Sequence, residues 1–210
     1  MVVNEVRRKG NNVYVLFNND KKMAIPYDVF LKNYLSIDDI VTEKIISELE
    51  VKVELYRIKQ SSFRYLSGRN HSKYELKIKL LKKKYNRALI ESVLQDLERQ
   101  QLINDVEFSN LYFRSQLRKK RGLLRIKAEL FKKGINREIV EETVRGHEDD
   151  DNFLESAKAV AGKKYNILSK RNLNNKQINQ KIYHFLISRG FTSNIIVETM
   201  KHLELENRDV

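Results

Sequence analysis

The residues best suited to chemistry in this sequence are closely spaced arginines and lysines, and the chemistry they suit is the binding of anions. Residues 114–137 contain ten basic side chains and one acidic side chain. Arg114 and Arg118 would lie one turn apart on a helix. Each guanidinium group can donate two parallel hydrogen bonds to a carboxylate or a phosphate. The candidate residues of this binding site are Arg69, Arg114, Arg118, Lys119, Lys120, Arg121, Arg125, Lys132 and Lys133.

The sequence contains no pattern typical of an active site. The Gly162-Lys163-Lys164 triplet lacks the upstream glycine and the hydroxyl group of a phosphate-binding loop. The four histidines are far apart, without the spacing of metal ligands, and there is no cysteine. His184 lies in an aromatic stretch and is expected to pack within a helix. We therefore predict no catalytic residue, no metal and no cofactor, and a protein that is not an enzyme.

An acidic run at residues 147–151 allows two interpretations. Clustered carboxylates can bind a hard cation. Acidic side chains are also stabilised in the first turn of a helix by the helix dipole. Because a helix is expected to begin at this point, the second interpretation is favoured.

The overall charge indicates an acidic partner. The formal net charge is +13, with 33% charged and 41% hydrophobic residues. An excess of this size suggests a polyanion or an acidic protein surface, although a simply solvated basic surface is the alternative. No signal peptide begins the sequence and no apolar run is long enough to span a bilayer. We expect a soluble, cytoplasmic protein without membrane contact.

The first 35 residues are expected to form a small sheet and a short helix. Val13, Val15 and Phe17 alternate with other side chains, and turn residues lie on both sides of this run. Such a small sheet is not stable alone, so it must pack on the helical part of the chain. We predict strands near residues 2–8, 12–17 and 22–25, and a helix at 27–35.

Three leucines mark an internal repeat in the rest of the chain. Leu80, Leu130 and Leu186 each have an aliphatic residue four positions before and an apolar residue five positions after. Gly134 and Gly190 follow the second and third leucines at the same distance, and glycine suits the left-handed turn that ends a helix. Each copy therefore predicts two helices joined by a tight turn.

A further helix is expected before each pair, near residues 42–68, 105–120 and 149–164. In the first of these, Ile45, Leu49 and Val53 recur at about one helical turn. Ser72 followed by Glu75 predicts a capped helix start. The fold class is thus mainly α: three tandem three-helix repeats forming an elongated curved body, with a small β-strand-rich N-terminal extension. The expected domains are residues 1–35, 36–103, 104–147 and 148–210.

Two segments resemble the RecX family of recombination regulators. Residues 66–76 are similar to its Leu-x-x-Arg-x-x-Ser-x-x-Glu-Leu run, and residues 125–135 to its Arg-Ile-x-x-Glu-Leu-x-x-Lys-Gly-Ile segment. The sequence departs from the family at three positions. Leu124 stands where the family often has proline, Ser109 where it has alanine, and Lys84 where it has a turn glycine.

The resemblance implies a negative modulator of RecA. Such proteins occupy the groove of the RecA–DNA filament and oppose filament growth, ATP hydrolysis and strand exchange. The expected partners are therefore the RecA filament, with single- or double-stranded DNA, and the expected state is a monomer. The candidate basic residues would make the contact. The motif residues Glu75, Glu129, Leu130 and Gly134 are expected to be structural: a cap, an intra-helix pair, a core residue and a turn.

Two other functions fit the same composition. A basic helical protein could bind nucleic acid without RecA, and its affinity for naked DNA would then fall steeply with salt. A scaffolding repeat protein could instead bind a different acidic protein. Binding to RecA filaments that resists salt would distinguish the first function from both.

Overall fold

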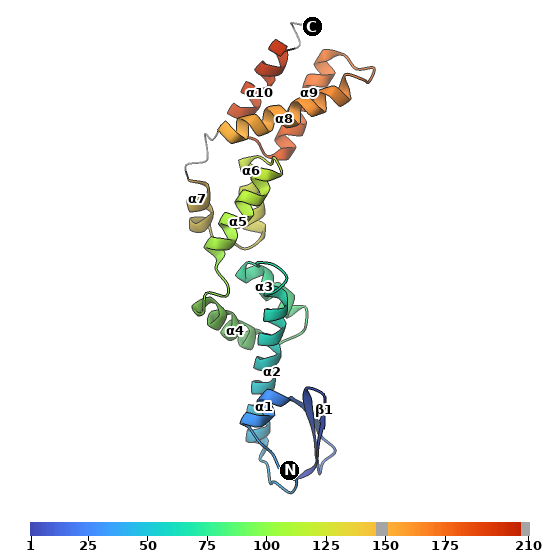
Figure 1. The fold of residues 1–210 in the computed structure, drawn as a ribbon, viewed down its shortest axis with the longest axis vertical. Helices are drawn as coiled ribbons and strands as arrows, with labels where there is room; N and C mark the ends of the chain where they lie inside the picture. The colour runs from blue at the N-terminus through green and yellow to red at the C-terminus, as the bar shows by residue number, and fades with distance from the viewer. Residues whose placement is uncertain (146–150, 207–210) are drawn as a thin grey trace. The chain divides into compact units, whose positions relative to one another are not determined.

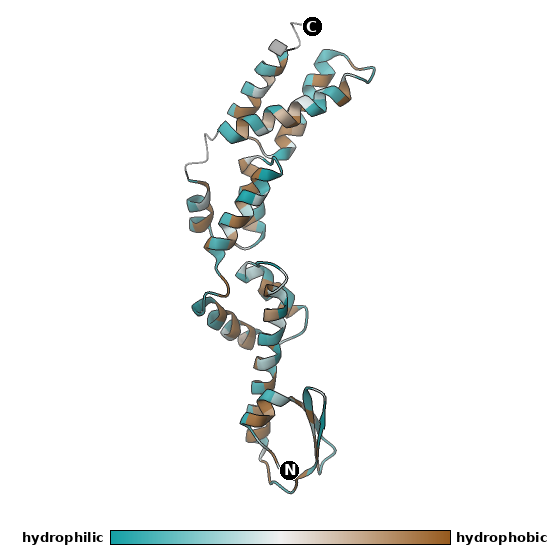
Figure 2. Ribbon diagram, in the orientation of Figure 1, coloured by the Kyte–Doolittle hydropathy of each residue, from teal (hydrophilic) through white to brown (hydrophobic). Residues whose placement is uncertain are grey.

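The computed structural model describes residues 1–145 and 151–206 and is mainly α. These residues form one three-stranded sheet and ten helices (Figure 1). The chain divides into two compact units, Met1–Ile103 and Asn104–Val210. Figure 2 shows hydrophilic and hydrophobic residues interleaved along most helices, as expected of helices with one buried face. The finer domain boundaries, after residues 35 and 147, stay predictions.

The small predicted sheet is present at the start of the first unit. Strands β1 (Val3–Lys9), β2 (Asn12–Phe17) and β3 (Lys22–Pro26) are antiparallel in the order β1-β2-β3. Helix α1 (Tyr27–Lys32) comes directly after β3. Val13, Val15 and Phe17 point to one side and are at most 2% exposed. Their core includes α1 and the first half of α2 (Glu43–Leu66), so one face of the sheet is covered.

The first repeat forms from α2, α3 (Lys73–Leu81) and α4 (Arg87–Arg99). Each helix begins where a polar side chain accepts a hydrogen bond from a free backbone N–H. The capping residues are Thr42, Ser72 and Asn86. The three helices enclose a core around Ile58, Leu76, Leu80, Ile90 and Leu94, each fully buried.

The second unit contains the other two repeats around one continuous core. The second repeat is α5 (Asp105–Arg118), α6 (Leu123–Lys132) and α7 (Arg137–Val144). The third is α8 (Asp151–Leu168), α9 (Asn175–Arg189) and α10 (Ser193–Glu206). Buried side chains from all six helices belong to a single cluster.

The turns of the repeat confirm the alignment on three leucines. Leu80, Leu130 and Leu186 are all completely buried. Gly134 and Gly190 have φ values of 73° and 81°, the left-handed conformation that ends a helix. Lys84, in the equivalent position of the first copy, has a φ of 62°. The turn is therefore present in all three copies, although a lysine adopts it at some energetic cost in the first.

Two expectations about single residues are wrong, and a third, about the acidic run, is tested only at Asp151. Ile45 is 46% exposed and Ile46 is 2% exposed, so the buried face at the start of α2 is shifted by one residue. His184 is exposed rather than packed, because it lies on the outer side of α9. Asp151 does lie in the first turn of α8. The rest of the acidic run, residues 147–150, lies outside the described residues.

Candidate binding site

Helix α5 presents two of the candidate arginines to solvent. Its start is fixed by Asn104, whose side chain accepts hydrogen bonds from the N–H groups of the second and third helical residues at 3.0 and 3.1 Å. Its buried side includes Phe108 and Phe113. The opposite side carries Arg114 and Arg118, both exposed and one turn apart as predicted. The helix thus holds two guanidinium groups on one outward face.

These arginines line a hollow between α5 and α8. The hollow measures about 540 Å³ and includes Leu111 and Leu117 beside the two arginines. Asn152 and Ser156 of α8 complete it. The rings of Phe113 on α5 and Phe153 on α8 meet edge to face, with centroids 6.3 Å apart. This contact packs the two helices together. A hollow with arginines, leucines and neutral polar groups suits an acidic side chain flanked by apolar ones.

The basic turn after α5, residues 119–122, has a backbone defined by hydrogen bonds. Lys119 is exposed, and Lys120 is partly exposed with a left-handed φ of 53°. The N–H of Lys120 donates to the Leu117 carbonyl at 2.8 Å, and the N–H of Arg121 donates to the Gln116 carbonyl at 3.3 Å. The turn therefore displays its lysines on a fixed backbone.

Two glycines hold this turn against the end of α9. The Gly122 N–H donates to the Arg189 carbonyl, and the Leu124 N–H donates to the Gly190 carbonyl, both at 2.9 Å. A Cβ atom on Gly122 would lie 2.1 Å from the carbonyl carbon of Gly190. No side chain fits in so small a space, so both positions require glycine.

Arg121 and Arg125 are engaged by an acidic residue of the same repeat. Arg121 Nη1 lies 2.5 and 2.6 Å from the two carboxylate oxygens of Glu129. Arg125 Nε donates to the same carboxylate at 3.1 Å and Nη1 donates to the Ser188 carbonyl at 2.9 Å. The Tyr112 hydroxyl adds a hydrogen bond to Glu129 at 2.5 Å. These two arginines therefore position the turn as well as contributing positive charge.

The same contacts keep Glu129 ionised. Burial by itself would raise the pKa of the Glu129 carboxyl. The hydrogen bonds from Tyr112 and Arg125 and the charges of Arg121 and Arg125 outweigh burial, so that pKa is lowered from its ordinary value. The expected intra-helix pair is thus confirmed as Arg125–Glu129, four residues apart.

The two lysines at the end of α6 differ in their surroundings. Lys132 is exposed. The Lys133 ammonium lies over the Tyr112 ring, 4.9 Å from its centroid, and 5.8 Å from that of Phe108. A cation on an aromatic face is stabilised by the ring quadrupole. Lys132 is therefore the freer of the two to meet a partner.

Arg69 belongs to the other unit and is also paired. It forms an ion pair with Glu75 at 2.9 Å, with Arg69 half exposed. The carbonyl of Arg69 lies 2.9 Å from Nδ1 of His71, whose Nε2 lies 2.8 Å from the Lys79 ammonium. Burial lowers the pKa of His71, and the charges of Arg69 and Lys79 act in the same direction. A neutral His71 can then donate to Arg69 and accept from Lys79.

The structure thus groups the predicted residues in three ways. Arg114 and Arg118 share the hollow, Arg121 and Arg125 share Glu129, and the three lysines 119, 120 and 132 are exposed or partly exposed. The sequence did not reveal the α8 side of the hollow. Asn152 and Ser156 lie more than 30 positions beyond Arg118, and no local pattern brings them to α5. Leu111 could have been predicted from the sequence. It precedes Arg114 and Arg118 by three and seven positions, a spacing that places all three on one face of a helix.

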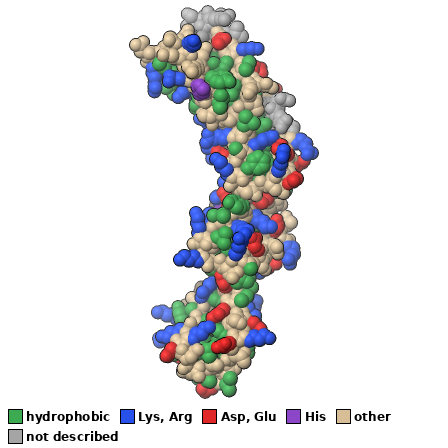
Figure 3. Space-filling view, turned by 180° about the vertical axis from the view of Figure 1, so that it is seen from behind, with side chains coloured by type: hydrophobic (Ala, Val, Ile, Leu, Met, Phe, Trp, Pro, Cys, Tyr) green, Lys and Arg blue, Asp and Glu red, His purple; other side chains and the backbone are tan. Residues whose placement is uncertain are grey.

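Positive charge is not limited to these groups. On the face drawn in Figure 3, Lys and Arg side chains occur over both units with Asp and Glu between them. Across the described ranges, His, Asp and Glu side chains form no group able to hold a metal ion. None of the helices in residues 1–145 and 151–206 is long and apolar enough to cross a membrane.

Three family models match this chain, each for one three-helix domain of RecX. The first domain matches residues 59–97, the second residues 104–144 and the third residues 150–200, together more than half of the chain. This chain belongs to the RecX family. The resemblance of residues 66–76 and 125–135 to RecX is thereby confirmed, and the third repeat, where no such motif was identified, matches RecX too.

Individual RecX proteins extend the match to nearly the whole chain. Regulatory protein RecX of Clostridium acetobutylicum is 25% identical over 202 residues, which cover 96% of this chain and 94% of the relative. A crystal structure of regulatory protein RecX has a TM-score of 0.72 at 20% identity, over 96% of this chain and 98% of that chain. The crystal structure of RecX from Lactobacillus salivarius has a TM-score of 0.63 at 25% identity. This match covers 72% of this chain and 97% of that chain.

The three departures from the RecX pattern are accommodated locally. Helix α6 begins at Leu123, so Leu124 fits its first turn without the family's proline. Ser109 is fully buried and its hydroxyl lies 2.8 Å from that of Thr143, so the polar atom is satisfied. Lys84 adopts the left-handed turn conformation that glycine has in the other repeats.

Proposed function

We propose that this RecX-family protein binds RecA and its DNA filament and inhibits filament extension, ATP hydrolysis and strand exchange. It would in this way regulate recombination and DNA repair. The observation that carries the proposal is the match of all three RecX three-helix domains in order along the chain. The net charge of +13 supports it, because a RecA–DNA filament presents phosphates and acidic protein side chains.

We propose that the hollow beside α5 and the turn after it make the main contact. Arg114 and Arg118 face this hollow, and Lys119 is exposed next to them. A guanidinium group can donate two hydrogen bonds at once to a carboxylate or a phosphate, so it loses less freedom per hydrogen bond than an ammonium group does. Arg121 and Arg125 would act mainly by holding the turn, because Glu129 already neutralises part of their charge.

The test is RecA ATPase activity on single-stranded DNA, with and without this protein. The wild-type protein is expected to reduce the steady-state rate. The R114E/R118E/K119E variant is expected to lose most of this inhibition, since it places three acids where an acidic partner would bind. Arg121 is left unchanged, because its reversal would place a second acid beside Glu129 and disturb the fold.

The control is K170E/R171E/K176E, which makes the same change in charge at three exposed positions of the same unit. This control should inhibit like the wild type, and both variants should keep the wild-type far-UV circular dichroism. Equal inhibition by the wild type and R114E/R118E/K119E would refute the assigned surface. Absence of any effect of the wild-type protein on RecA would refute the function.

Binding measurements separate this function from binding to nucleic acid alone. Association with preformed RecA filaments is expected to resist an increase in salt better than association with naked DNA does, because protein contacts add to the phosphate contacts. Equal salt dependence for filaments and naked DNA would instead favour a nucleic-acid-binding protein that acts without RecA.

A further inference from the structure

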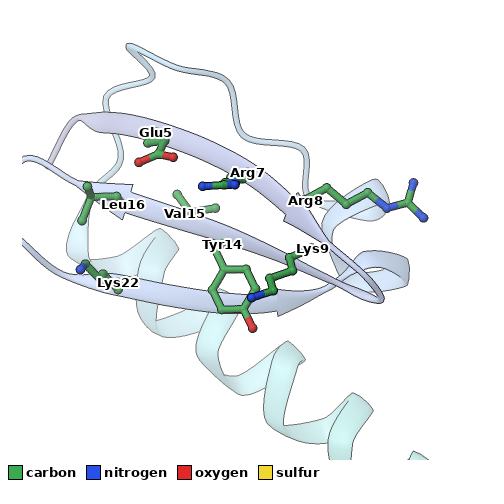
Figure 4. Close-up of a pocket in the computed structure, with 8 residues that line it drawn as sticks. All are labelled: Glu5, Arg7, Arg8, Lys9, Tyr14, Val15, Leu16 and Lys22. Carbon is green, nitrogen blue, oxygen red and sulfur yellow. The ribbon is translucent and has the colours of Figure 1, made fainter.

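The outer face of the N-terminal sheet forms a second basic surface, far in sequence from the candidate site. Figure 4 looks onto this face, with helices behind the strands. Residues from all three strands line a shallow hollow of about 550 Å³. Alternation along the strands turns Arg7, Tyr14 and Lys22 away from the core that Val13, Val15 and Phe17 form on the other face.

Tyr14 stands at the centre of this surface. It lies on β2, the middle strand, and is 46% exposed. Its direct neighbours across the sheet are Arg7 on β1 and Ala24 on β3. Because Ala24 has only a methyl side chain, that flank leaves space beside the tyrosine ring. The ring is therefore a flat, accessible aromatic surface, with the Arg7 side chain beside it on β1.

Positive charge surrounds this ring. Arg7, Lys9 and Lys22 all line the hollow and are exposed, against one acid, Glu5. Figure 4 shows the Lys9 and Tyr14 side chains next to each other. Arg57 of α2 donates a hydrogen bond to the Ala24 carbonyl at 2.7 Å, so a further cation lies at the β3 edge, outside the lining of the hollow. The surface therefore favours a polyanionic ligand.

We propose that this face binds single-stranded nucleic acid, with Tyr14 stacking on a base and Arg7, Lys9 and Lys22 contacting phosphates. An exposed aromatic ring on a central strand with cations around it combines the two interactions that bind single strands, stacking and phosphate contact. A duplex keeps its base faces stacked inside and could not use Tyr14. An acidic peptide would satisfy the cations, but only an aromatic or arginine side chain in it could stack on the ring, whereas every nucleotide brings a base.

The proposal is independent of RecA. It concerns the first unit alone, and it holds whether or not the basic turn of the second unit binds a filament. The two surfaces can therefore be tested separately on the full-length protein.

The first test measures binding of a fluorescent oligothymidine to the full-length protein by anisotropy at low salt. Y14A is expected to lose at least about five-fold in affinity, the lower end of what stacking on one base contributes. Y14F should bind within about two-fold of the wild type, because phenylalanine keeps the ring. R7Q/K9Q/K22Q should bind more weakly still. Its affinity should also depend less on salt. Each lost phosphate contact is expected to reduce the slope of log K against log salt concentration by about 0.7, so three lost contacts reduce it by about 2.

The matched control is R64Q/K82Q/R87Q, which removes three exposed basic side chains from α2, the C-cap of α3 and α4 in the same unit. It makes the same change in charge and should bind like the wild type. If this control loses as much affinity as R7Q/K9Q/K22Q, the effect is one of net charge and the proposal is wrong.

The second test locates the bound strand, because other basic surfaces of the chain also attract DNA. An oligonucleotide containing 5-iodouracil is crosslinked to the wild-type protein by light, and the modified peptide is identified by mass spectrometry. A crosslink at Tyr14 that a duplex oligonucleotide does not give is the expected result. Crosslinks confined to the second unit, or equal affinity of Y14A and the wild type, would overturn the proposal. Tighter binding of an acidic peptide than of the oligonucleotide at this face would overturn it too.

Discussion

The Glu129 carboxylate accepts hydrogen bonds from Tyr112 and Arg121 and also pairs with Arg125, so three side chains from α5, the turn and α6 depend on one acid. At 20% exposure it is partly shielded from water, where such contacts are stronger than on an open surface. The geometry of the basic turn is therefore expected to depend on the ionised form of this residue.

We expect Glu129→Gln to lower the free energy of unfolding by about 1–3 kcal/mol at neutral pH, since the arginines lose their charged acceptor. The lowered pKa of Glu129 means that the wild type keeps this stabilisation above the ordinary carboxyl value of 4.5 and loses it as the pH falls through the lower folded-state value. Urea unfolding of both proteins at several pH values should show the difference shrinking below that point.

Glu142→Gln is the control for this prediction. Glu142 pairs with Arg145 three residues away, but its side chain is 65% exposed. Its substitution should change stability by no more than about 0.5 kcal/mol. A difference between Glu129→Gln and the wild type that stays constant down to acid pH would contradict the assigned role of the carboxylate.

The turn after α3 is a place where the first repeat carries a backbone strain that the other two avoid. Lys84 holds a left-handed φ of 62°, where the later repeats have glycine. We expect Lys84→Gly to stabilise the protein by up to about 1 kcal/mol, because glycine adopts this conformation without a steric cost. Thermal or urea unfolding measures the change.

Lys82→Gly provides the comparison, since Lys82 is also exposed but has an ordinary helical φ of −61°. Glycine there only adds freedom to the unfolded chain, so this variant should be less stable than the wild type. Equal effects of the two substitutions would show that backbone strain at Lys84 is not significant.

The elements of this fold are largely predictable from the sequence because their signals are local. Caps such as Ser72 and the buried leucines of the repeat set the bounds of helices, and alternation identified the strands. On α2 the predicted core positions Leu49 and Val53 are buried, but at the helix start Ile46 takes the place predicted for Ile45. Both isoleucines fit the spacing, and only tertiary packing distinguishes them.

The site was predicted only in part, for the same physical reason. The spacing of Arg114 and Arg118 was enough to place them on one outward face. The pairing of Arg121 with Glu129 depends on the path of the turn, and the hollow depends on how α8 packs on α5. Contacts of this kind result from the folded core and have no local pattern in the sequence.

At the scale of the whole molecule, the buried side chains divide by unit. Two clusters lie within Met1–Ile103, and one cluster joins all six helices of Asn104–Val210. Since a domain with its own core can fold alone, we expect residues 104–210, expressed separately, to be helical and to unfold in one cooperative transition. Circular dichroism during urea unfolding measures both properties, and a fragment without helical signal would contradict the division.

The contact between Gly122 and Gly190 has a consequence for the order of events during synthesis. The N–H groups of Gly122 and Leu124 find their backbone acceptors only at Arg189 and Gly190, more than 60 positions later in the sequence. A ribosome must therefore translate past α9 before the backbone that carries the basic turn can be completed. Closing so long a loop is slow compared with forming a helix. The surface proposed to meet RecA therefore cannot mature on the nascent protein until α9 and the turn after it have been made.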